Sequence, residues 1–149
     1  MDNADEPYAE EIAKAIASQL RRGKKIETTT RLAEVIAEAL AFLPDAERKE
    51  TVKKSCARVF QALRIDVNSE YEVLDAFLQK LPAAMAPGGR IAILTFHSGE
   101  DRLVKKSFKE WKKAGVYSEI AEEVIRPSAQ ECARNSRARS TKMRWAVKA

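Results

Sequence analysis

One stretch near the middle of the chain restricts the fold more than any other feature. It is the apolar run Ile91-Ala92-Ile93-Leu94-Thr95-Phe96, which follows the turn signal Pro87-Gly88-Gly89. The run shows little alternation of polar and apolar residues, which is typical of a strand covered by helices on both faces. Helical spacing precedes and follows it, and that order of elements is typical of a doubly wound α/β sheet. We therefore predict one buried parallel strand here.

Helices are expected on both sides of this strand. Apolar residues recur at helical spacing through 71–85 and again through 98–113. Ser98 and Asp101 fit the pattern in which a serine hydroxyl caps a helix, so Ser98 is expected to be the cap. Near the end of the chain, residues 142–147 alternate between polar and apolar. This alternation predicts a half-exposed C-terminal edge strand.

The N-terminal part of the chain has a different character. Residues 1–47 carry six basic and ten acidic residues, whereas 48–149 carry 21 basic and 12 acidic residues. Apolar residues recur every four positions from Tyr8 to Leu20, and the run Thr28-Thr29-Thr30 offers hydroxyls that can cap a second helix. We predict an acidic helical segment followed by a basic α/β segment.

Composition excludes several classes of protein. The chain has 149 residues, a net charge of +5 and 33% charged residues, as expected of a folded, soluble domain. No apolar run approaches the roughly 18 residues that cross a membrane, and the acidic start lacks the features of a signal or transit peptide. The distant Cys56 and Cys132 offer no disulfide framework, which favours a reducing compartment. None of the five glycines has the spacing of a phosphate-binding loop.

The segment that follows the predicted buried strand carries the strongest candidates for chemistry. Ligands of open α/β sheets bind beyond the carboxyl ends of the strands, so His97, Glu100 and Asp101 are candidate catalytic residues that line such a crevice. The alternative is structural, because acidic side chains also stabilise the first turn of a helix. One histidine and two distant cysteines cannot supply a zinc site, so we expect no metal.

A basic C-terminal tail is the second candidate site. Clustered arginine and lysine side chains bind phosphates through charge-assisted hydrogen bonds. The alternative is a solvated strand edge, because cations there also prevent aggregation. Net charge and clustering favour contact with nucleic acid, and the candidate RNA-binding residues are Arg134, Arg137, Arg139, Lys142 and Arg144.

Several segments together resemble one family, the 16S rRNA (cytosine-N(4))-methyltransferases known as RsmH or MraW. The segments that carry the resemblance are Thr28-Thr29-Thr30-Arg31-Leu32-Ala33-Glu34, Phe60-Gln61-Ala62-Leu63-Arg64-Ile65, Pro87-Gly88-Gly89-Arg90, Phe96-His97-Ser98 with Glu100-Asp101-Arg102, Arg126-Pro127-Ser128 and Arg137-Ala138-Arg139-Ser140. Their order and spacing cover nearly the whole chain. The sequence departs from the family at Gly99, where members usually have leucine.

The resemblance implies both a fold and a domain division. Members of the family have a Rossmann-type methyltransferase domain that is interrupted by a small helical domain. Residues 1–58 resemble the last part of this inserted helical domain, and 59–149 resemble the C-terminal half of the methyltransferase domain. The expected fold is therefore α/β, with a partial Rossmann-type sheet preceded by helices of the insertion.

The resemblance also implies an activity, which is S-adenosylmethionine-dependent transfer of a methyl group to a cytosine amine in small-subunit rRNA. Such an enzyme works in the cytoplasm or, in a eukaryote, in an organelle. The family's S-adenosylmethionine loop lies upstream and nothing here matches it, so we expect no cofactor-binding residue in this chain. We expect a fragment that needs a complementary N-terminal half or associates with itself, because an incomplete sheet exposes apolar faces. The alternative is a non-catalytic RNA- or partner-binding module derived from the family, and no membrane contact is expected.

Overall fold

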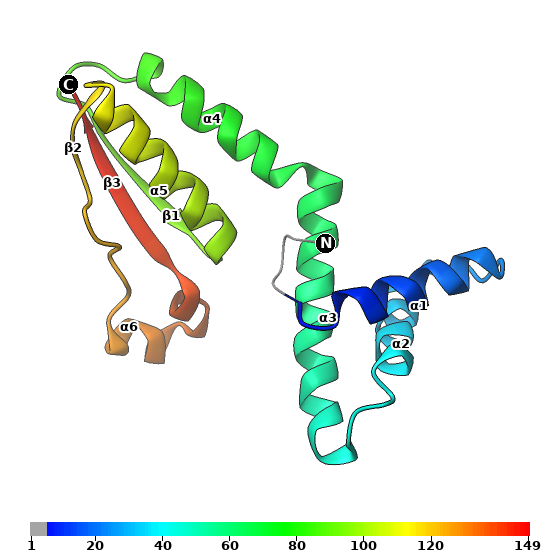
Figure 1. The fold of residues 1–149 in the computed structure, drawn as a ribbon. Helices are drawn as coiled ribbons and strands as arrows, with labels where there is room; N and C mark the ends of the chain where they lie inside the picture. Colours follow the sequence, from blue (N-terminus) through cyan, green and yellow to red (C-terminus); the bar gives the residue numbers. More distant parts are fainter. Residues whose placement is uncertain (1–5) are drawn as a thin grey trace. The chain divides into compact units, whose positions relative to one another are not determined.

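The computed structural model of the chain describes residues 6–149. These residues form two compact units, which divide between Asn68 and Ser69. The division falls at the end of a long helix, Asp45–Asn68, and residue 58 lies inside that helix. The assignment of residues 1–58 to an inserted domain concerns the family's architecture and stays a prediction. Figure 1 shows the order of the elements in each unit.

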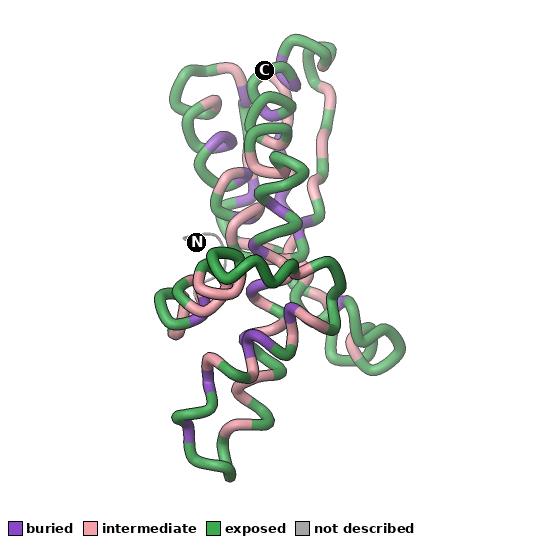
Figure 2. The backbone as a smooth tube through the Cα atoms, turned by 90° about the vertical axis from the view of Figure 1, so that its right-hand side faces the viewer, coloured by how far each residue is buried: buried purple, intermediate pink, exposed green. Residues whose placement is uncertain are grey.

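The first unit is helical, as the apolar spacing predicts. It contains α1 (Ala9–Arg21), α2 (Thr29–Ala39) and α3 (Asp45–Asn68). The Thr28 hydroxyl accepts a hydrogen bond from the Arg31 N–H (3.1 Å), which confirms the expected cap at the start of α2. Apolar side chains of the three helices form one core; its buried members are Ile12, Leu32, Ile36, Leu40, Leu43 and Val59. Buried and exposed positions alternate along these helices (Figure 2).

The second unit combines helices with a small sheet. Its helices are α4 (Glu70–Ala84), α5 (Ser98–Lys113) and α6 (Ala129–Arg134), and its strands are β1 (Arg90–Thr95), β2 (Tyr117–Ile120) and β3 (Lys142–Lys148). A 3-10 helix, η1 (Ser136–Ser140), precedes β3. One face of the sheet packs against α4 and α5 through a core whose buried members are Leu78, Val104, Phe108, Tyr117 and Ala146.

The sheet corrects two expectations about the strands. Its order is β1-β3-β2, so β3 is the central strand and not an edge. β1 pairs with β3 in the antiparallel direction, from Arg90 opposite Val147 to Thr95 opposite Lys142. Among residues 6–149 it has no parallel partner, so the expected parallel pairing is not confirmed; an apolar run indicates a strand but not the direction of its neighbour. The expectation of an edge strand was wrong because alternation reports which face is buried, and it carries no information on the number of neighbouring strands. The expectation of burial was wrong as well, because Ala92 and Leu94 on β1 are exposed. Among residues 6–149, no strand pairs with the outer edge of β1.

A third correction concerns the start of α5. This helix spans Ser98–Lys113, as predicted, but its cap is His97 and not Ser98. His97 has extended backbone angles, which lets the ring reach the first turn, whereas Ser98 is already the first helical residue. Histidine is uncommon at helix caps, whereas serine is favoured there. For this reason the sequence pattern predicts Ser98 as the cap.

Candidate functional site

The turn from β1 into α5 places His97 against the first turn of the helix. The Glu100 N–H donates to His97 Nδ1 over 3.5 Å, a long hydrogen bond. Because Nδ1 accepts, a neutral His97 ring carries its proton on Nε2. Nε2 is fully enclosed and lies 3.4 Å from Glu100 Oε1, within ion-pair distance but without hydrogen-bond geometry. The structure thus brings His97 and Glu100 together.

The Glu100 carboxylate is a partly exposed polar group of this turn. Its Oε2 accepts a hydrogen bond from the Phe96 N–H (2.9 Å), and a quarter of its side chain is exposed. Glu70, at the start of α4, brings a third ligand atom within 4.8 Å of those of His97 and Glu100. A histidine that binds a metal usually donates its other ring N–H to an acceptor, whereas His97 Nδ1 accepts. We assign no metal to this cluster.

Tyr71 of α4 completes the surroundings of His97. The two rings lie 5.9 Å apart between centroids and are tilted by 51°. The Tyr71 ring occupies the space that a side chain at Gly99 would fill, because a Cβ there would lie 2.6 Å from Tyr71 Cζ. Gly99 therefore accommodates this tyrosine.

Asp101 points away from this cluster, toward the central strand. It is 8% exposed and accepts two hydrogen bonds from Arg144, at 2.7 Å from Nε and 3.2 Å from the second guanidinium nitrogen. Lys142 Nζ lies 3.6 Å from the same carboxylate. Asp101, Lys142 and Arg144 form one ion cluster between α5 and β3, which we call the buried ion cluster. A bidentate arginine pair of this kind is held by geometry as well as by charge.

The pKa of Asp101 reflects two opposing influences. Burial is the largest single influence and would raise this pKa. The hydrogen bonds and positive charges of Arg144 and Lys142 together outweigh it, so the pKa of Asp101 lies below its ordinary value. Asp101 is therefore ionised throughout the neutral range. Its negative charge neutralises the arginine charge that is buried with it.

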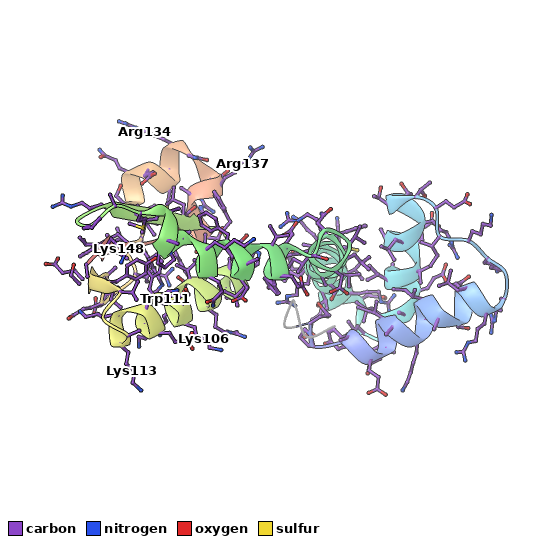
Figure 3. All side chains as sticks on the ribbon, turned by 90° about the horizontal axis from the view of Figure 1, so that it is seen from above. Lys106, Trp111, Lys113, Arg134, Arg137 and Lys148 are labelled. Carbon is purple, nitrogen blue, oxygen red and sulfur yellow. The ribbon has the colours of Figure 1, made fainter. Side chains whose placement is uncertain are left out.

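The remaining predicted RNA-binding residues stand on the surface. Arg134 ends α6, whose cap is the Ser128 hydroxyl, while Arg137 and Arg139 belong to η1, whose cap is Asn135. All three arginines are exposed. Figure 3 shows Arg134 and Arg137 projecting outward from this segment. We call Arg134, Arg137 and Arg139 the arginine surface.

A second basic surface escaped the sequence interpretation. Five exposed lysines follow one another along α5 at helical spacing; they are Lys105, Lys106, Lys109, Lys112 and Lys113. Figure 3 shows Lys106 and Lys113 on the opposite side of the unit from Arg134. The signal that could have revealed this surface is the recurrence of lysine every three or four residues within the predicted helix.

The comparison with known proteins concerns the whole chain. A sequence model of the MraW methylase family matches residues 1–149. No helix among residues 6–149 is long and apolar enough to cross a bilayer.

The curated relatives are considerably longer than this chain. Ribosomal RNA small subunit methyltransferase H 1 of Lachnoclostridium phytofermentans is 64% identical over 149 residues, which cover all of this chain and 41% of that protein. The protein of the same name from Agathobacter rectalis is 63% identical over 148 residues, which cover 99% of this chain and 42% of that protein. A match over its full length and identities of this size show that the chain belongs to the MraW methylase family.

Proposed function

We propose that this chain is the C-terminal part of an S-adenosylmethionine-dependent methyltransferase that modifies small-subunit rRNA, of the cytosine-N(4) type, in the cytoplasm. The observation that carries the proposal is the family match over residues 1–149, together with relatives that are named rRNA small subunit methyltransferases. The chain spans only 41% of the first of these relatives. The complete activity on this proposal therefore needs the complementary part of the family's polypeptide.

The described residues do not fit the methyl donor. A nucleotide-like cofactor in an α/β sheet needs a glycine-rich turn where backbone and ligand approach closely. The first glycine after β1 is Gly99, the second residue of α5, and the Tyr71 ring fills the space beside it. The proposal assigns the donor site to the complementary part.

Residues of this chain are proposed to receive the RNA base. An enzyme that modifies a base must take it out of the stack and hold it by its polar edge. The amine of cytosine is a hydrogen-bond donor, and the partly exposed carboxylate of Glu100 is an acceptor. His97 has an enclosed Nε2, so its proposed role is to position Glu100. Holding the amine in place is the main contribution expected here.

Reconstitution tests this proposal. The chain is mixed with the part of the Lachnoclostridium phytofermentans enzyme that it does not match, with small-subunit rRNA and S-adenosylmethionine labelled in its methyl group. We expect methylation of cytosine in the mixture, no saturable binding of the donor by the chain alone, and a loss of at least about tenfold with Glu100→Gln. Glu110→Gln on the same helix is the matched control. Donor binding by the chain alone would contradict the division of labour.

One variant separates the capping of α5 by His97 from its proposed role in positioning Glu100. Asparagine is a favourable helix cap, so His97→Asn keeps an acceptor for the Glu100 N–H and removes the imidazole. Unchanged unfolding with reduced methylation is the result expected of a positioning residue. Unchanged methylation would limit His97 to the cap.

The arginine surface is proposed to bind the RNA backbone. Arg137→Ala combined with Arg139→Ala is expected to weaken RNA binding. The plot of log binding constant against log salt concentration should become less steep by about 1.4, since each lost contact with single-stranded phosphate contributes about 0.7 to its steepness. Lys24→Ala with Lys25→Ala, two exposed cations of the first unit, is the control. Filter binding from low to high salt measures both slopes. An unchanged slope would show that these arginines do not contact RNA phosphates and serve only to keep this surface solvated.

The exposed arginine surface also favours a second candidate function. A chain without a donor site that keeps this surface could act as a non-catalytic RNA-binding module. This function predicts that RNA binding depends on Arg137 and Arg139 while the reconstituted mixture shows no methylation. The same two measurements therefore distinguish the candidates.

A further inference from the structure

The exposed side of α5 carries almost only positive charge. Its five exposed lysines, which we call the lysine face, are Lys105, Lys106, Lys109, Lys112 and Lys113. Arg102 extends this side by one turn toward the start of the helix, and Glu110 is the one acidic residue at an exposed position of α5. Residues three and four apart lie side by side on a helix. The cations therefore form one continuous stripe, about 16 Å long at 1.5 Å per residue.

The packing of α5 determines where this stripe points. The buried residues Val104 and Phe108 belong to the core of the second unit. Because successive residues of a helix point about 100° apart, the lysines lie on the opposite side of α5 from these two residues. Figure 3 shows Lys106 and Lys113 on the other side of the unit from Arg134. The lysine face and the arginine surface therefore cannot contact the same phosphates.

Solubility alone does not explain a helix face of one sign. A helix that is only solvated carries charges of both signs, which form pairs along its surface. The long helix α3 follows this rule, because Arg48 pairs with Asp45 and Lys54 pairs with Glu50. The exposed charges of α5 therefore differ in kind from those of α3.

The lysine face is also unfavourable for the helix itself. Among residues 6–149, Lys106 is the one lysine of this face with an acidic partner, Glu110 at 4.0 Å. Like charges four residues apart destabilise a helix, as with Lys105 and Lys109 or Lys109 and Lys113. The helix dipole favours cations only in the last turn, which leaves Lys105 and Lys109 unexplained. A bound polyanion would offset the repulsion among these lysines.

The surroundings of the lysines distinguish between classes of polyanion. A helix that binds a membrane surface inserts its apolar side, whereas Val104 and Phe108 of α5 are buried in the core. An interface with another protein relies on apolar and aromatic anchors and is depleted in lysine, and no exposed position of α5 carries an apolar side chain. RNA needs neither of these features, because lysines attract its regular phosphates as point charges.

We propose that the lysine face of α5 binds the phosphate backbone of RNA, at a different segment from the one that the arginine surface contacts. The inference rests on the proposed function, which makes small-subunit rRNA the partner, and it adds a second contact surface. Contacts with phosphates position an RNA without reading its bases. Two basic surfaces on opposite sides of one unit then hold two segments of a folded RNA.

Salt-dependent binding tests the lysine face. Lys105→Gln, Lys109→Gln and Lys112→Gln are combined in one variant, because glutamine removes the charge and keeps a good helix former. Filter binding of the chain to small-subunit rRNA should be at least about tenfold weaker at low salt. The plot of log binding constant against log salt concentration should become less steep by about 2, since each lost contact with single-stranded phosphate contributes about 0.7.

A matched control removes the same number of charges from the first unit. It combines Lys24→Gln, Lys49→Gln and Lys53→Gln, all at exposed positions. We expect this control to bind RNA within about threefold of the parent chain. An equal loss of binding in the control would overturn the inference, because net charge and not the lysine face would then determine binding.

Combining the variants tests whether the two surfaces hold different segments. Arg137→Ala and Arg139→Ala are added to the glutamine variant of the lysine face. The factors by which the two sets weaken binding should multiply, because groups that are far apart and share no partner contribute independently. A combined loss no larger than that of either set alone would overturn the assignment to separate segments.

Two further measurements can overturn the inference. Vesicles of phosphatidylcholine and phosphatidylserine should not bind the chain through these lysines; glutamine substitutions that abolish vesicle binding and leave RNA binding unchanged would assign the face to a membrane. The glutamine variant should unfold at the same temperature as the parent chain or at a higher one, because it relieves repulsion. A lower unfolding temperature would show that the lysines serve to stabilise α5.

These measurements need neither the methyl donor nor the complementary part of the enzyme. RNA binding that depends on the lysine face supports the inference even where the reconstituted mixture shows no methylation, a result that would overturn only the proposed enzyme activity. Methylation in the mixture together with unchanged RNA binding by the glutamine variant would overturn only the role of the lysine face.

Discussion

Replacing Asp101 by asparagine is expected to destabilise the second unit by about 3–5 kcal/mol, the usual cost of removing one partner of a buried ion pair. The amide has nearly the same shape as the carboxylate, so the loss reports charge and not packing. Arg144, whose side chain is 8% exposed, would keep a buried positive charge with only a neutral acceptor beside it. Urea unfolding followed by tryptophan fluorescence measures the effect, because Trp145 is adjacent to Arg144 on β3.

Two comparisons make this prediction specific to the buried ion cluster. Asp45 forms an ion pair with Arg48, and the Asp45 side chain is 92% exposed. Asp45→Asn removes this exposed pair and should change the unfolding free energy little. Asp101→Leu combined with Arg144→Met removes both charges, and should recover most of the stability that either change alone loses. Equal destabilisation by the double variant would show that packing, and not charge, holds α5 to β3.

The same carboxylate predicts a pH dependence with a definite sign. The pKa of Asp101 is lowered in the folded chain from an ordinary value of 3.8. Its contribution to stability is therefore complete above that value and is lost as the pH falls through the lower folded-state pKa. Unfolding free energies measured between neutral and strongly acidic pH should fall more steeply in the parent chain than in Asp101→Asn. Parallel curves would contradict the assignment.

Gly99→Leu is expected to be the second strongly destabilising change. A Cβ at this position would lie 2.6 Å from Tyr71 Cζ and 3.1 Å from Cε1, so the whole ring must move away from the start of α5. Overpacking of this kind typically costs about 1–3 kcal/mol. Displacement of the ring would also remove the contact between Tyr71 and His97. Thermal unfolding measures the cost.

A compensating substitution separates steric overlap from other effects at Gly99. Tyr71→Ala makes room for the new side chain, so Gly99→Leu should be tolerated better in the Tyr71→Ala background than in the parent chain. Lys105→Leu, at an exposed position of the same helix, controls for the added leucine. If Gly99→Leu lowers the unfolding free energy equally in both backgrounds, steric overlap with Tyr71 is not the cause of the destabilisation.

The local elements follow from the sequence to different degrees. The amphipathic helices around Leu32 and Phe108 and the boundaries of α5 could be predicted, because apolar spacing and caps act within one or two turns. The strand β2 was not predicted, because Tyr117–Ile120 holds four residues, two of which are exposed and polar. So short a segment has no detectable period. It becomes a strand by pairing with β3.

In the candidate site too, contacts between distant parts of the chain decide what the sequence pattern leaves open. His97 and Glu100 are three residues apart on one helical turn, and the sequence predicted that they share the end of β1. Asp101 is adjacent to Glu100 in sequence, but it points to β3 because successive residues on a helix point about 100° apart. The sequence pattern treated all three as one group, and only the packing of α5 on the sheet separates them.

Patterns of neighbouring residues are enough to predict the helices and the turn that carries His97, and the motifs spread along the chain are enough to recognise the family. Which charges a ligand can reach depends on how the helices and strands pack together. Arg144 resembles Arg137 and Arg139 in the sequence, but a strand 43 residues beyond Asp101 brings it under α5 and neutralises it there. Contacts between residues so far apart depend on how helix and sheet pack together, and no local pattern records them.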